Sequence, residues 1–516
     1  MVLSRLDCSD DLVLKNLKIA KINSTPIKSF KDPLYGSIQI DAQALAIIDT
    51  PEFQRLRFIK QTGLVYLLYP SAHHTRFEHS IGCYHLACNL LETISTHQQS
   101  VVEQKDLGLV SVAALIHDLG HGPFSHSFDD ILKRMNAFKE SHEERSIRIL
   151  RFMNEKYDFG IEEDDIQIIS ALIQGKSLNR KKNYLYQIVS NSDFEIDVDK
   201  LDYLLRDAYL TTNLSITDVS RIIGKVKVFS NEGNLCGLDD NSASTLAYAK
   251  NMDIDLTNVL WNRYSNFQQI YCHKTSLILT QMVEDAIILA NTHFKWHEMV
   301  TDIDLFCTLD DTILREIERC RSDSEEIKKA KEILSRIFNR DLYKFVHHSV
   351  IPTDQAAVLQ AKISSILNKY PSEDYRLIST KLTLNKANDQ VDLVKQNVWF
   401  WSRNGTTFTA TKNSPSTFLM KADLKRETHF WVFSTNENIP LITEIAHKLQ
   451  DEIDLLRDEL NEISIESTPT PKINLNSRSR TNEVSKTPPL PSKSYSIDLS
   501  SPLPTLPPLK NSVKNN

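Results

Sequence analysis

Apolar residues recur every three or four positions through most of residues 40–340. The segments DAQALAIIDTPEFQRLRFI, SIGCYHLACNLLETIS and TSLILTQMVEDAIILANTHF all follow this spacing, and few glycines interrupt them. Such spacing is typical of a helix that buries one face and exposes the other. We therefore expect a mainly α protein whose core is all-helical.

The pattern changes to alternation of apolar and polar residues from about residue 376. LISTKLTL, NVWFWS, TTFTAT and HFWVFS have the period of strands, and Asn404-Gly405 is a typical hairpin turn. The segment EIAHKLQDEIDLLRDELNEI then returns to helical spacing. One face of this segment carries the apolar residues Leu449, Ile453, Leu456, Leu460 and Ile463. We favour packing of this face on the same lobe over pairing with another helix. We expect a small mixed α/β lobe over residues 351–464.

Composition changes again after residue 464. Half of the 18 prolines lie in residues 465–516, among Ser, Thr, Asn and Lys. Such a segment buries too little apolar surface to fold alone, so we predict a disordered tail. Regulation through this tail is one interpretation, because it contains four Ser/Thr-Pro pairs beginning at Thr468, Thr470, Thr487 and Ser501.

Overall composition indicates a globular protein of the cytoplasm or nucleus. The chain has 516 residues, of which 41% are hydrophobic, enough for a large core. Its first 21 residues contain neither a spanning helix nor a signal peptide, so we expect no membrane association. The seven cysteines lack a CxxC pair and read as reduced thiols. A net charge of −7 argues against a protein that coats nucleic acid, but not against a small phosphorylated substrate.

Two histidines and two aspartates have the chemistry of a metal site. They are His79 in RFEHS, His117 and Asp118 in AALIHDLGHGPFSH, and Asp199 in EIDVDKLDY. Imidazole and carboxylate groups suit zinc, iron or manganese, and magnesium would accompany phosphates. A metal here would lower the pKa of a bound water and polarise a phosphoryl oxygen. A lone His-Asp pair is more often a packed core pair, which is the alternative to this interpretation.

The residues that follow Asp118 favour the metal interpretation. Gly120, Gly122 and Pro123 end the helix, so His121 and His126 would lie across the mouth of a cleft. Two cations are also close to the ligands in sequence, Arg76 three residues before His79 and Lys200 directly after Asp199. Both would neutralise phosphate charge near the metal.

These motifs resemble those of the HD-domain phosphohydrolases, which share the pattern H…HD…D. The similarity extends over residues 28–350, where DPLYGSIQI, IIDTPEFQRLRFIKQTG, HHTRFEHSIG, IVSNSDFEIDVDKLDYLLRDAYL and RDLYKFV are found. These segments resemble the eukaryotic deoxynucleoside triphosphate triphosphohydrolases that join a sterile alpha motif to an HD domain. The resemblance implies hydrolysis of dNTPs, including dGTP, to deoxynucleoside and inorganic triphosphate, which would control dNTP pools. Residues 1–27 are too few for a sterile alpha motif domain.

The resemblance also implies roles for individual residues. His126 matches the histidine that protonates the departing 5′-oxygen, and Asp129 would orient it. His121 and His142 match histidines along the phosphate channel. A further set matches contacts to the substrate sugar and phosphates, and within it the aromatic ring would exclude a 2′-hydroxyl: Gln61, Tyr203, Asp207, Arg263 and Tyr271.

Members of this family are activated by nucleotides that bind between subunits and assemble a tetramer. The resemblance thus implies a homo-oligomer, from dimer to tetramer. The guanine-nucleotide site is matched by Lys28, Asp49, Gln54, Arg57, Arg340 and Lys344. The neighbouring dNTP site is matched by Asp218, Arg221, His273 and Lys274, but Lys31, Ser37, Leu238 and Asp240 depart from the family pattern. Activation by a guanine nucleotide is therefore expected, and a second activating dNTP is less well supported.

Two other functions remain open from the residues alone. One is an HD-domain phosphodiesterase or nucleotidase that acts on another phosphate ester, because the metal ligands do not select the substrate. The other is a non-catalytic protein that binds nucleotides or, weakly, single-stranded nucleic acid. Gln61, Tyr203, Asp207 and Tyr271 argue against the first, and the intact metal ligands and His126 argue against the second.

Overall fold

The computed structural model describes residues 27–99, 101–137, 139–211, 217–230, 243–382, 398–402, 407–409, 427–435 and 437–466, and side chains to residue 455. The chain divides into two compact units, Met1–Glu459 and Leu460–Asn516. Several predictions fall outside the described residues: the segment before residue 27, the loop with Leu238 and Asp240, the turn at Asn404-Gly405, the side chains of Leu456, Leu460 and Ile463, and the proline-rich tail. The domain boundaries at 27/28, 350/351 and 464/465 stay predictions.

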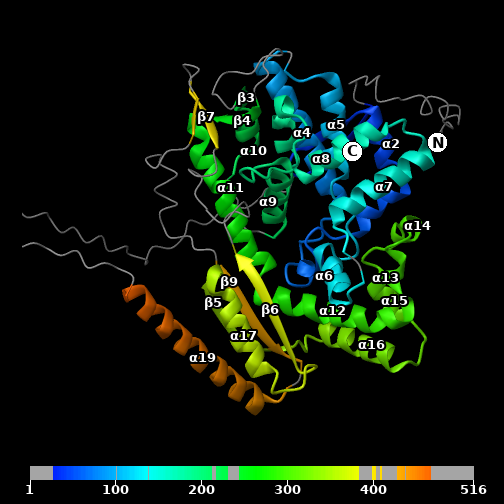
Figure 1. The fold of residues 1–516 in the computed structure, drawn as a ribbon. Helices are drawn as coiled ribbons and strands as arrows, with labels where there is room; N and C mark the ends of the chain where they lie inside the picture. Colours follow the sequence, from blue (N-terminus) through cyan, green and yellow to red (C-terminus); the bar gives the residue numbers. More distant parts are fainter. Residues whose placement is uncertain are drawn as a thin grey trace, which may run out of the picture. The chain divides into compact units, whose positions relative to one another are not determined.

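Helices dominate the part of the chain with the three-to-four spacing, which confirms the mainly α fold (Figure 1). They are α2 (Ala42–Ile48), α3 (Pro51–Gln54), α4 (Arg76–His97), α5 (Gln104–Ile116), α6 (His126–Arg134), α7 (His142–Tyr157), α8 (Glu163–Gln174), α9 (Val198–Thr211), α10 (Val219–Ile223), α11 (Asp253–Asn266), α12 (Lys274–Phe294), α13 (Trp296–Met299), α14 (Ile303–Phe306), α15 (Ile313–Arg319) and α16 (Glu325–Phe338). Short 3-10 helices are η2 (Arg55–Phe58), η3 (Gly63–Leu67), η4 (Arg180–Gln187) and η5 (Lys250–Met252), and η6 (Phe267–Tyr271) is a short π-helix.

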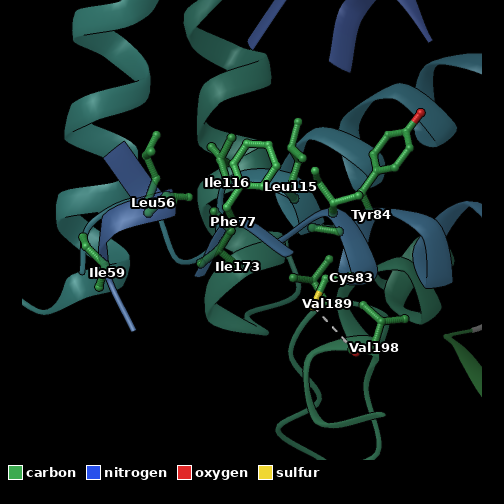
Figure 2. Close-up of a cluster of buried hydrophobic side chains, with 14 of the residues drawn as sticks. Leu56, Ile59, Phe77, Cys83, Tyr84, Leu115, Ile116, Ile173, Val189 and Val198 are labelled. Atoms are coloured by element: carbon green, nitrogen blue, oxygen red, sulfur yellow. Dashed lines mark hydrogen bonds between the residues drawn. The ribbon is translucent and has the colours of Figure 1, made fainter. Parts of the chain in front are cut away.

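Helices α4 and α5 form the centre of the core. A capping box of Thr75 and Glu78 begins α4, because each residue accepts from the backbone of the other. Figure 2 shows the buried cluster around them, in which Phe77, Leu115 and Ile116 pack together. All three side chains are 3% exposed or less. This packing fixes the two helices that carry His79 and His117 relative to each other.

The helical region also contains small sheets, and the helical spacing of its sequence did not indicate them. β1 (Lys28–Asp32) and β2 (Gly36–Ile40) form a hairpin. β3 (Val226–Ser230) pairs with β4 (Ser244–Ala249), and β4 also pairs in parallel with β7 (Trp399–Trp401), which pairs with β8 (Thr407–Thr409). Every residue of β4 is buried, so its sequence shows none of the alternation by which half-exposed strands are recognised.

The C-terminal lobe has the mixed α/β composition that alternation predicted. β5 (Lys344–Pro352), β9 (Glu427–Ser434) and β6 (Tyr375–Leu382) form an antiparallel sheet in that order. The accompanying helices are η7 (Thr353–Gln355), α17 (Ala356–Leu367) and α19 (Ile439–Glu466). Leu449 and Ile453 of α19 are buried, as expected for packing on the same lobe. No helix among the described residues has both the length and the apolar character needed to cross a membrane.

Candidate metal centre and active site

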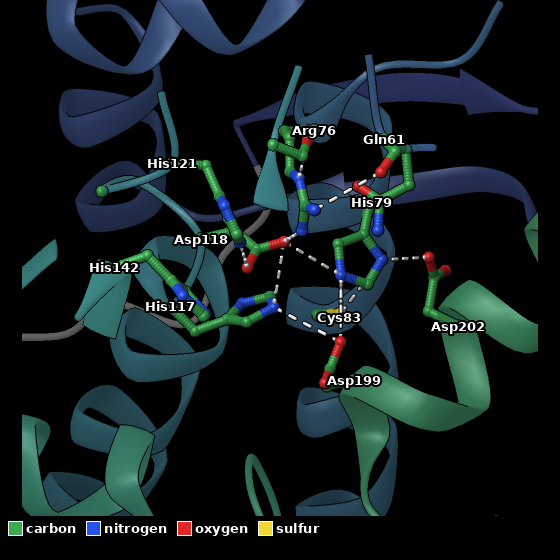
Figure 3. Close-up of polar contacts among 12 residues, drawn as sticks. Gln61, Arg76, His79, Cys83, His117, Asp118, His121, His142, Asp199 and Asp202 are labelled. Carbon is green, nitrogen blue, oxygen red and sulfur yellow. Dashed lines mark hydrogen bonds and ion pairs between the residues drawn. The ribbon is translucent and has the colours of Figure 1, made fainter. Parts of the chain in front are cut away.

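The four predicted metal ligands meet at one point, although they come from three helices (Figure 3). His79 lies in the first turn of α4, His117 and Asp118 follow the last residue of α5, and Asp199 is the second residue of α9. Nε2 of His79 lies 3.3 Å from Oδ2 of Asp118 and 3.1 Å from Oδ1 of Asp199. Nε2 of His117 lies 3.5 and 3.6 Å from the same two oxygens. Four donor atoms at these spacings surround a space suited to one cation.

Hydrogen bonds orient both imidazoles so that Nε2 faces this space. Nδ1 of His79 lies 2.8 Å from Oδ2 of Asp202, which is itself paired with Arg206 at 2.9 Å. Arg206 also reaches Oδ2 of Asp32 at 2.8 Å. Nδ1 of His117 donates to the carbonyl oxygen of Ala114 at 2.8 Å. Partners on the far side of a ligating histidine fix its ring and raise its basicity.

The donor set fits a divalent metal. Nε2 of His117 is buried and has no hydrogen-bond partner among the described residues, as expected of an atom reserved for a ligand. His79, His117, Asp118 and Asp199 would hold the ion, and two imidazoles with two carboxylates suit iron, zinc or manganese. Cys83 was missed by the sequence interpretation. Its Sγ lies 3.6 Å from Nε2 of His79, and its position four residues later on α4 was the available signal.

Arg76 is committed to the metal ligands in this structure. It is buried, forms an ion pair with Asp118, and donates from Nε to Oγ of Ser125 at 2.9 Å. Burial acts to raise the pKa of Asp118, but Arg76, His117 and His121 together outweigh it and hold that pKa well below its usual range. Lys200 lines a cavity that adjoins the metal ligands, and its Nζ donates to the carboxylate of Asp197 at 2.8 Å.

Three histidines cluster beside the metal centre, with His121 stacked on His142 and His126 edge-on to both. The ring centroids of His121 and His142 are 4.0 Å apart, and that of His126 lies 4.8 and 5.4 Å from them. Burial lowers the pKa of His126 to about 4, and the nearby charge of Arg76 acts in the same direction. Its imidazole is therefore neutral near pH 7 when the cavity holds no anion.

Asp129 does not orient His126 in the way the sequence interpretation expected. Its carboxylate pairs with Arg145 and lies 3.6 Å from Nδ1 of His142, and no hydrogen bond joins it to His126 among the described residues. Burial acts to raise the pKa of Asp129, yet His142 and Arg145 together hold it well below its usual range. It is a permanent negative charge beside the three histidines.

The turn before α6 has an unusual backbone. Phe124 and Ser125 have φ of 59° and 60°, a region that residues other than glycine rarely adopt. Asp311 holds this turn, because its carboxylate accepts from the backbone N of Phe124 at 2.6 Å and of Lys60 at 2.9 Å. Burial raises the pKa of Asp311 to about 7 despite these bonds. Asp311 lies 187 positions after Phe124, so no local pattern in the sequence indicates this contact.

A cavity of about 560 Å³ adjoins the metal ligands. It is lined by all the residues expected to contact substrate: Gln61, Arg76, Lys200, Tyr203, Asp207, Arg263 and Tyr271. Asp207 accepts from the Tyr271 hydroxyl and lies 2.6 Å from Nε2 of His74, a contact that the sequence did not indicate. Oε1 of Gln61 is buried without a hydrogen-bond partner among the described residues. Burial raises the pKa of Tyr203 to about 12, so its hydroxyl remains a donor.

The first set of expected activator residues is partly assembled. Nζ of Lys28 lies 3.5 Å from Oδ1 of Asp49, and Nε of Arg57 donates to Oε1 of Gln54 at 2.7 Å. Arg57 is exposed, and its guanidinium lies over the Phe77 ring at 3.4 Å. Of the remaining two, Arg340 donates to the carbonyl oxygen of Leu67, and Lys344 pairs with Asp341 and Glu437.

Residues of the second activator set have local structural roles. Asp218 caps α10, and His273 caps α12. Arg221 lies 3.3 Å from Asp255, and Lys274 lies over the ring of Phe345 at 4.9 Å. Two of the residues that depart from the family pattern, Lys31 and Ser37, face each other across the β1–β2 hairpin. The function of this set stays a prediction.

The contact between Asp202 and His79 gives a testable prediction. Asp202→Asn should lower metal affinity about 10- to 100-fold, because the amide no longer provides the charge that orients and polarises the imidazole. Metal content after dialysis against graded chelator measures this. Asp165→Asn is the control, since Asp165 is also buried but pairs with Lys105 away from the site. Equal metal retention in both variants would contradict the prediction.

Comparison with known proteins relates this chain to HD-domain proteins. Residues 76–207 match the HD domain family. A deoxynucleoside triphosphate triphosphohydrolase SAMHD1 homolog of Dictyostelium discoideum is 34% identical over 400 residues, which cover 75% of this chain and 74% of that protein. A putative HD domain-containing protein of Acanthamoeba polyphaga mimivirus is 33% identical over 373 residues, 67% of this chain and 79% of the viral one.

The vertebrate relatives are longer than the matched region. Human deoxynucleoside triphosphate triphosphohydrolase SAMHD1 is 31% identical over 426 residues, which cover 75% of this chain but 65% of the human protein. The match to the bovine protein covers 60% of its length. The HD match, these identities and the converged His and Asp ligands lead to one assignment: the chain belongs to the SAMHD1 family of HD-domain deoxynucleoside triphosphate triphosphohydrolases.

Proposed function

We propose that this protein hydrolyses deoxynucleoside triphosphates to deoxynucleoside and inorganic triphosphate, and so limits dNTP pools. The observation that carries the proposal is the meeting of His79, His117, Asp118 and Asp199 beside a cavity lined by Tyr271 and other predicted substrate residues. The names of the relatives point to the same substrate class.

A bound metal would supply an activated water and polarise the α-phosphoryl oxygen. The protein's own residues then divide the remaining work. Arg76, beside Asp118, places positive charge where the phosphates would lie, and Lys200 adds a second cation. His121 and His142 line the cavity and would donate hydrogen bonds to the phosphate chain. Magnesium would accompany the phosphates themselves.

His126 is the proposed general acid for the departing 5′-oxygen. Its imidazole is neutral in the free protein because burial lowers its pKa. A bound triphosphate brings negative charge, which favours the imidazolium and raises that pKa. Asp129 would act through His142 and Arg145, since these are the groups that it contacts. Binding of the triphosphate would thus favour protonation of His126.

Selection for deoxyribose would come from Tyr271 and its neighbours. The Tyr271 hydroxyl donates to Asp207, and this bond fixes the ring at the wall of the cavity. A fixed ring against C2′ would leave no room for a 2′-hydroxyl. Gln61, with a free buried acceptor, and Tyr203, with a donor, would contact the sugar 3′-hydroxyl, and Arg263 would reach a phosphate.

Product analysis tests the proposed reaction. Metal-loaded protein is incubated with dGTP, dATP or GTP, with and without GTP as activator, and the products are separated by ion exchange. We expect deoxynucleoside and intact triphosphate from the deoxynucleotides, and loss of activity by at least about a hundredfold in Asp118→Ala because a ligand is missing. Asp304→Ala, a change at an exposed aspartate, is the control.

Other products would point to other functions. Monophosphate with pyrophosphate, or stepwise release of orthophosphate, would contradict the proposal and favour another HD-domain hydrolase. Absence of turnover in correctly loaded protein would favour a non-catalytic nucleotide or nucleic-acid binder.

The pH dependence tests the role of His126. A general acid must be protonated, so kcat should fall as pH rises through the pKa of His126 in the substrate complex. Because burial holds the free-enzyme pKa of His126 near 4, the fall in kcat/KM should occur at lower pH than the fall in kcat. Steady-state kinetics from about pH 3 to about pH 9 measure both falls. His126→Asn should lack the alkaline fall in kcat; retention of it would assign the acid to another group.

We further propose that a guanine nucleotide activates the protein and promotes a homo-oligomer, a dimer or tetramer. Asp49 would read the guanine edge, with Gln54 and Arg57 beside it, and Lys28 would reach a phosphate. Supporting this, Asp49 pairs with Lys28 and Arg57 contacts Gln54. Arg340 and Lys344 would complete the phosphate contacts. Nuclear or cytoplasmic location, a second dNTP activator and weak binding of single-stranded nucleic acid stay predictions.

Arg57→Ala tests the activator site. Loss of a charge-assisted contact should raise the GTP concentration for half-maximal activation by about tenfold or more. Titration of dNTP hydrolysis with GTP measures this, and sedimentation reports the accompanying assembly. Arg315→Ala, another exposed arginine, is the control and should titrate as the unmodified protein does. The same GTP dependence in Arg57→Ala would place the activator elsewhere.

A further inference from the structure

A buried carboxylate in α12 gathers polar side chains from three other parts of the chain. Oδ1 of Asp285 accepts from Nη2 of Arg134 at 2.8 Å and from Nε2 of Gln281 at 3.1 Å. Its Oδ2 accepts from the Tyr343 hydroxyl at 3.0 Å and from Nε of Arg376 at 2.9 Å. Asp285 is 6% exposed. We call Asp285, Arg134, Tyr343 and Arg376 the Asp285 node.

One side of the node is the helix that begins with His126. Arg134 is the last residue of α6, nine residues long, and His126 is the first. Besides Asp285, Arg134 contacts Oε2 of Glu284 at 3.0 Å, so two carboxylates of α12 hold the end of this helix. Backbone hydrogen bonds join successive turns of an α-helix, so a shift at Arg134 would be passed along α6 toward His126.

The other side of the node is the C-terminal lobe. Arg376 lies in β6, and Tyr343 directly precedes β5. Nη1 of Arg376 donates to the carbonyl oxygens of Ser372, Glu373 and Tyr375 at 3.0 to 3.2 Å. The guanidinium is therefore fixed to the lobe at one end and to α12 at the other. α6, α12 and β6 can be followed in Figure 1.

Charge balance makes the members of the node depend on one another. Two guanidinium groups, of Arg134 and Arg376, face two carboxylates, of Glu284 and Asp285. Both carboxylates are buried, and a buried charge is costly unless it is paired. Loss of Arg376 leaves Arg134 as the guanidinium partner of Asp285 among the described residues, so the contact that holds the end of α6 would change.

We propose that Asp285 and Arg376 are positioning residues through which docking of the C-terminal lobe sets the place of α6, and with it His126. The inference rests on the proposed role of His126 as general acid. It gives the lobe a function in catalysis, although none of its described strands lines the cavity at the metal centre. Movement of the lobe would change activity through α6 without changing any metal ligand.

The test compares two arginines that both tie the core to the lobe. Arg376→Met removes the link to the node. Arg336→Met is the matched control, because Arg336 of α16 contacts the carbonyl oxygen of Thr435 at 3.2 Å and Asp341 at 2.8 Å. Its guanidinium approaches the node at the Tyr343 ring, 5.5 Å from the ring centroid, and forms no ion pair with Asp285 among the described residues. Amide hydrogen exchange over residues 126–134 and steady-state dNTP hydrolysis are measured on the full chain.

In Arg376→Met, α6 should exchange about tenfold faster, and kcat should fall about tenfold with KM nearly unchanged. Arg336→Met should change neither quantity. Arg376→Lys retains the positive charge and should restore part of the kcat. If the methionine variant folds poorly, the lysine variant provides the comparison with the unmodified protein.

Three results would overturn the inference: equal effects of Arg376→Met and Arg336→Met, unchanged exchange in α6, or faster exchange with unchanged kcat. If the unmodified protein hydrolyses no dNTP, the proposed function fails. The exchange experiment then still decides whether the lobe holds α6.

Discussion

The active site depends on a chain of buried charges that runs from β1 to the metal centre. Asp32 pairs with Arg206, Arg206 with Asp202, and Asp202 with Nδ1 of His79. Asp202 and Arg206 are 1% exposed or less, so burying the charge of either one without the other would strongly destabilise the fold. Gly82 permits this approach of α4 to α9, since a Cβ there would lie 2.0 Å from Oδ1 of Asp202. The orientation of His79 therefore depends on β1, α4 and α9 together.

A similar dependence extends over the rest of the site. Asp311 holds the turn before α6 through two backbone N–H groups, and Asp285 holds the end of α6 through Arg134. Both acids come from the region after residue 280, far from the segments that supply the metal ligands. His126, at the start of α6, thus lies between these two contacts, and its position is set by the packing of distant helices.

Much of the architecture could be predicted from the sequence because helical spacing and strand alternation report one-sided burial. Both fail where an element is buried on all sides, as β4 is. The grouping of His79, His117, Asp118 and Asp199 was also predictable, because the H…HD…D pattern supplies imidazole and carboxylate groups, which are the residue types that bind a divalent metal. Asp202, His74, Cys83 and Asp311 were missed, and Asp129 was given His126 as a partner where the structure gives it Arg145 and His142.

The sequence by itself determined the fold class, the metal-ligand chemistry and the residue types in the cavity. These follow from local spacing and from the chemical nature of each side chain, both of which are properties of the chain alone. Tertiary structure decided which carboxylate supports which histidine, which cations are already paired, and how the lobe contacts α6. Buried ion pairs join residues separated by scores of positions, as Asp285 and Arg376 are, and no periodicity in the sequence records such a partnership.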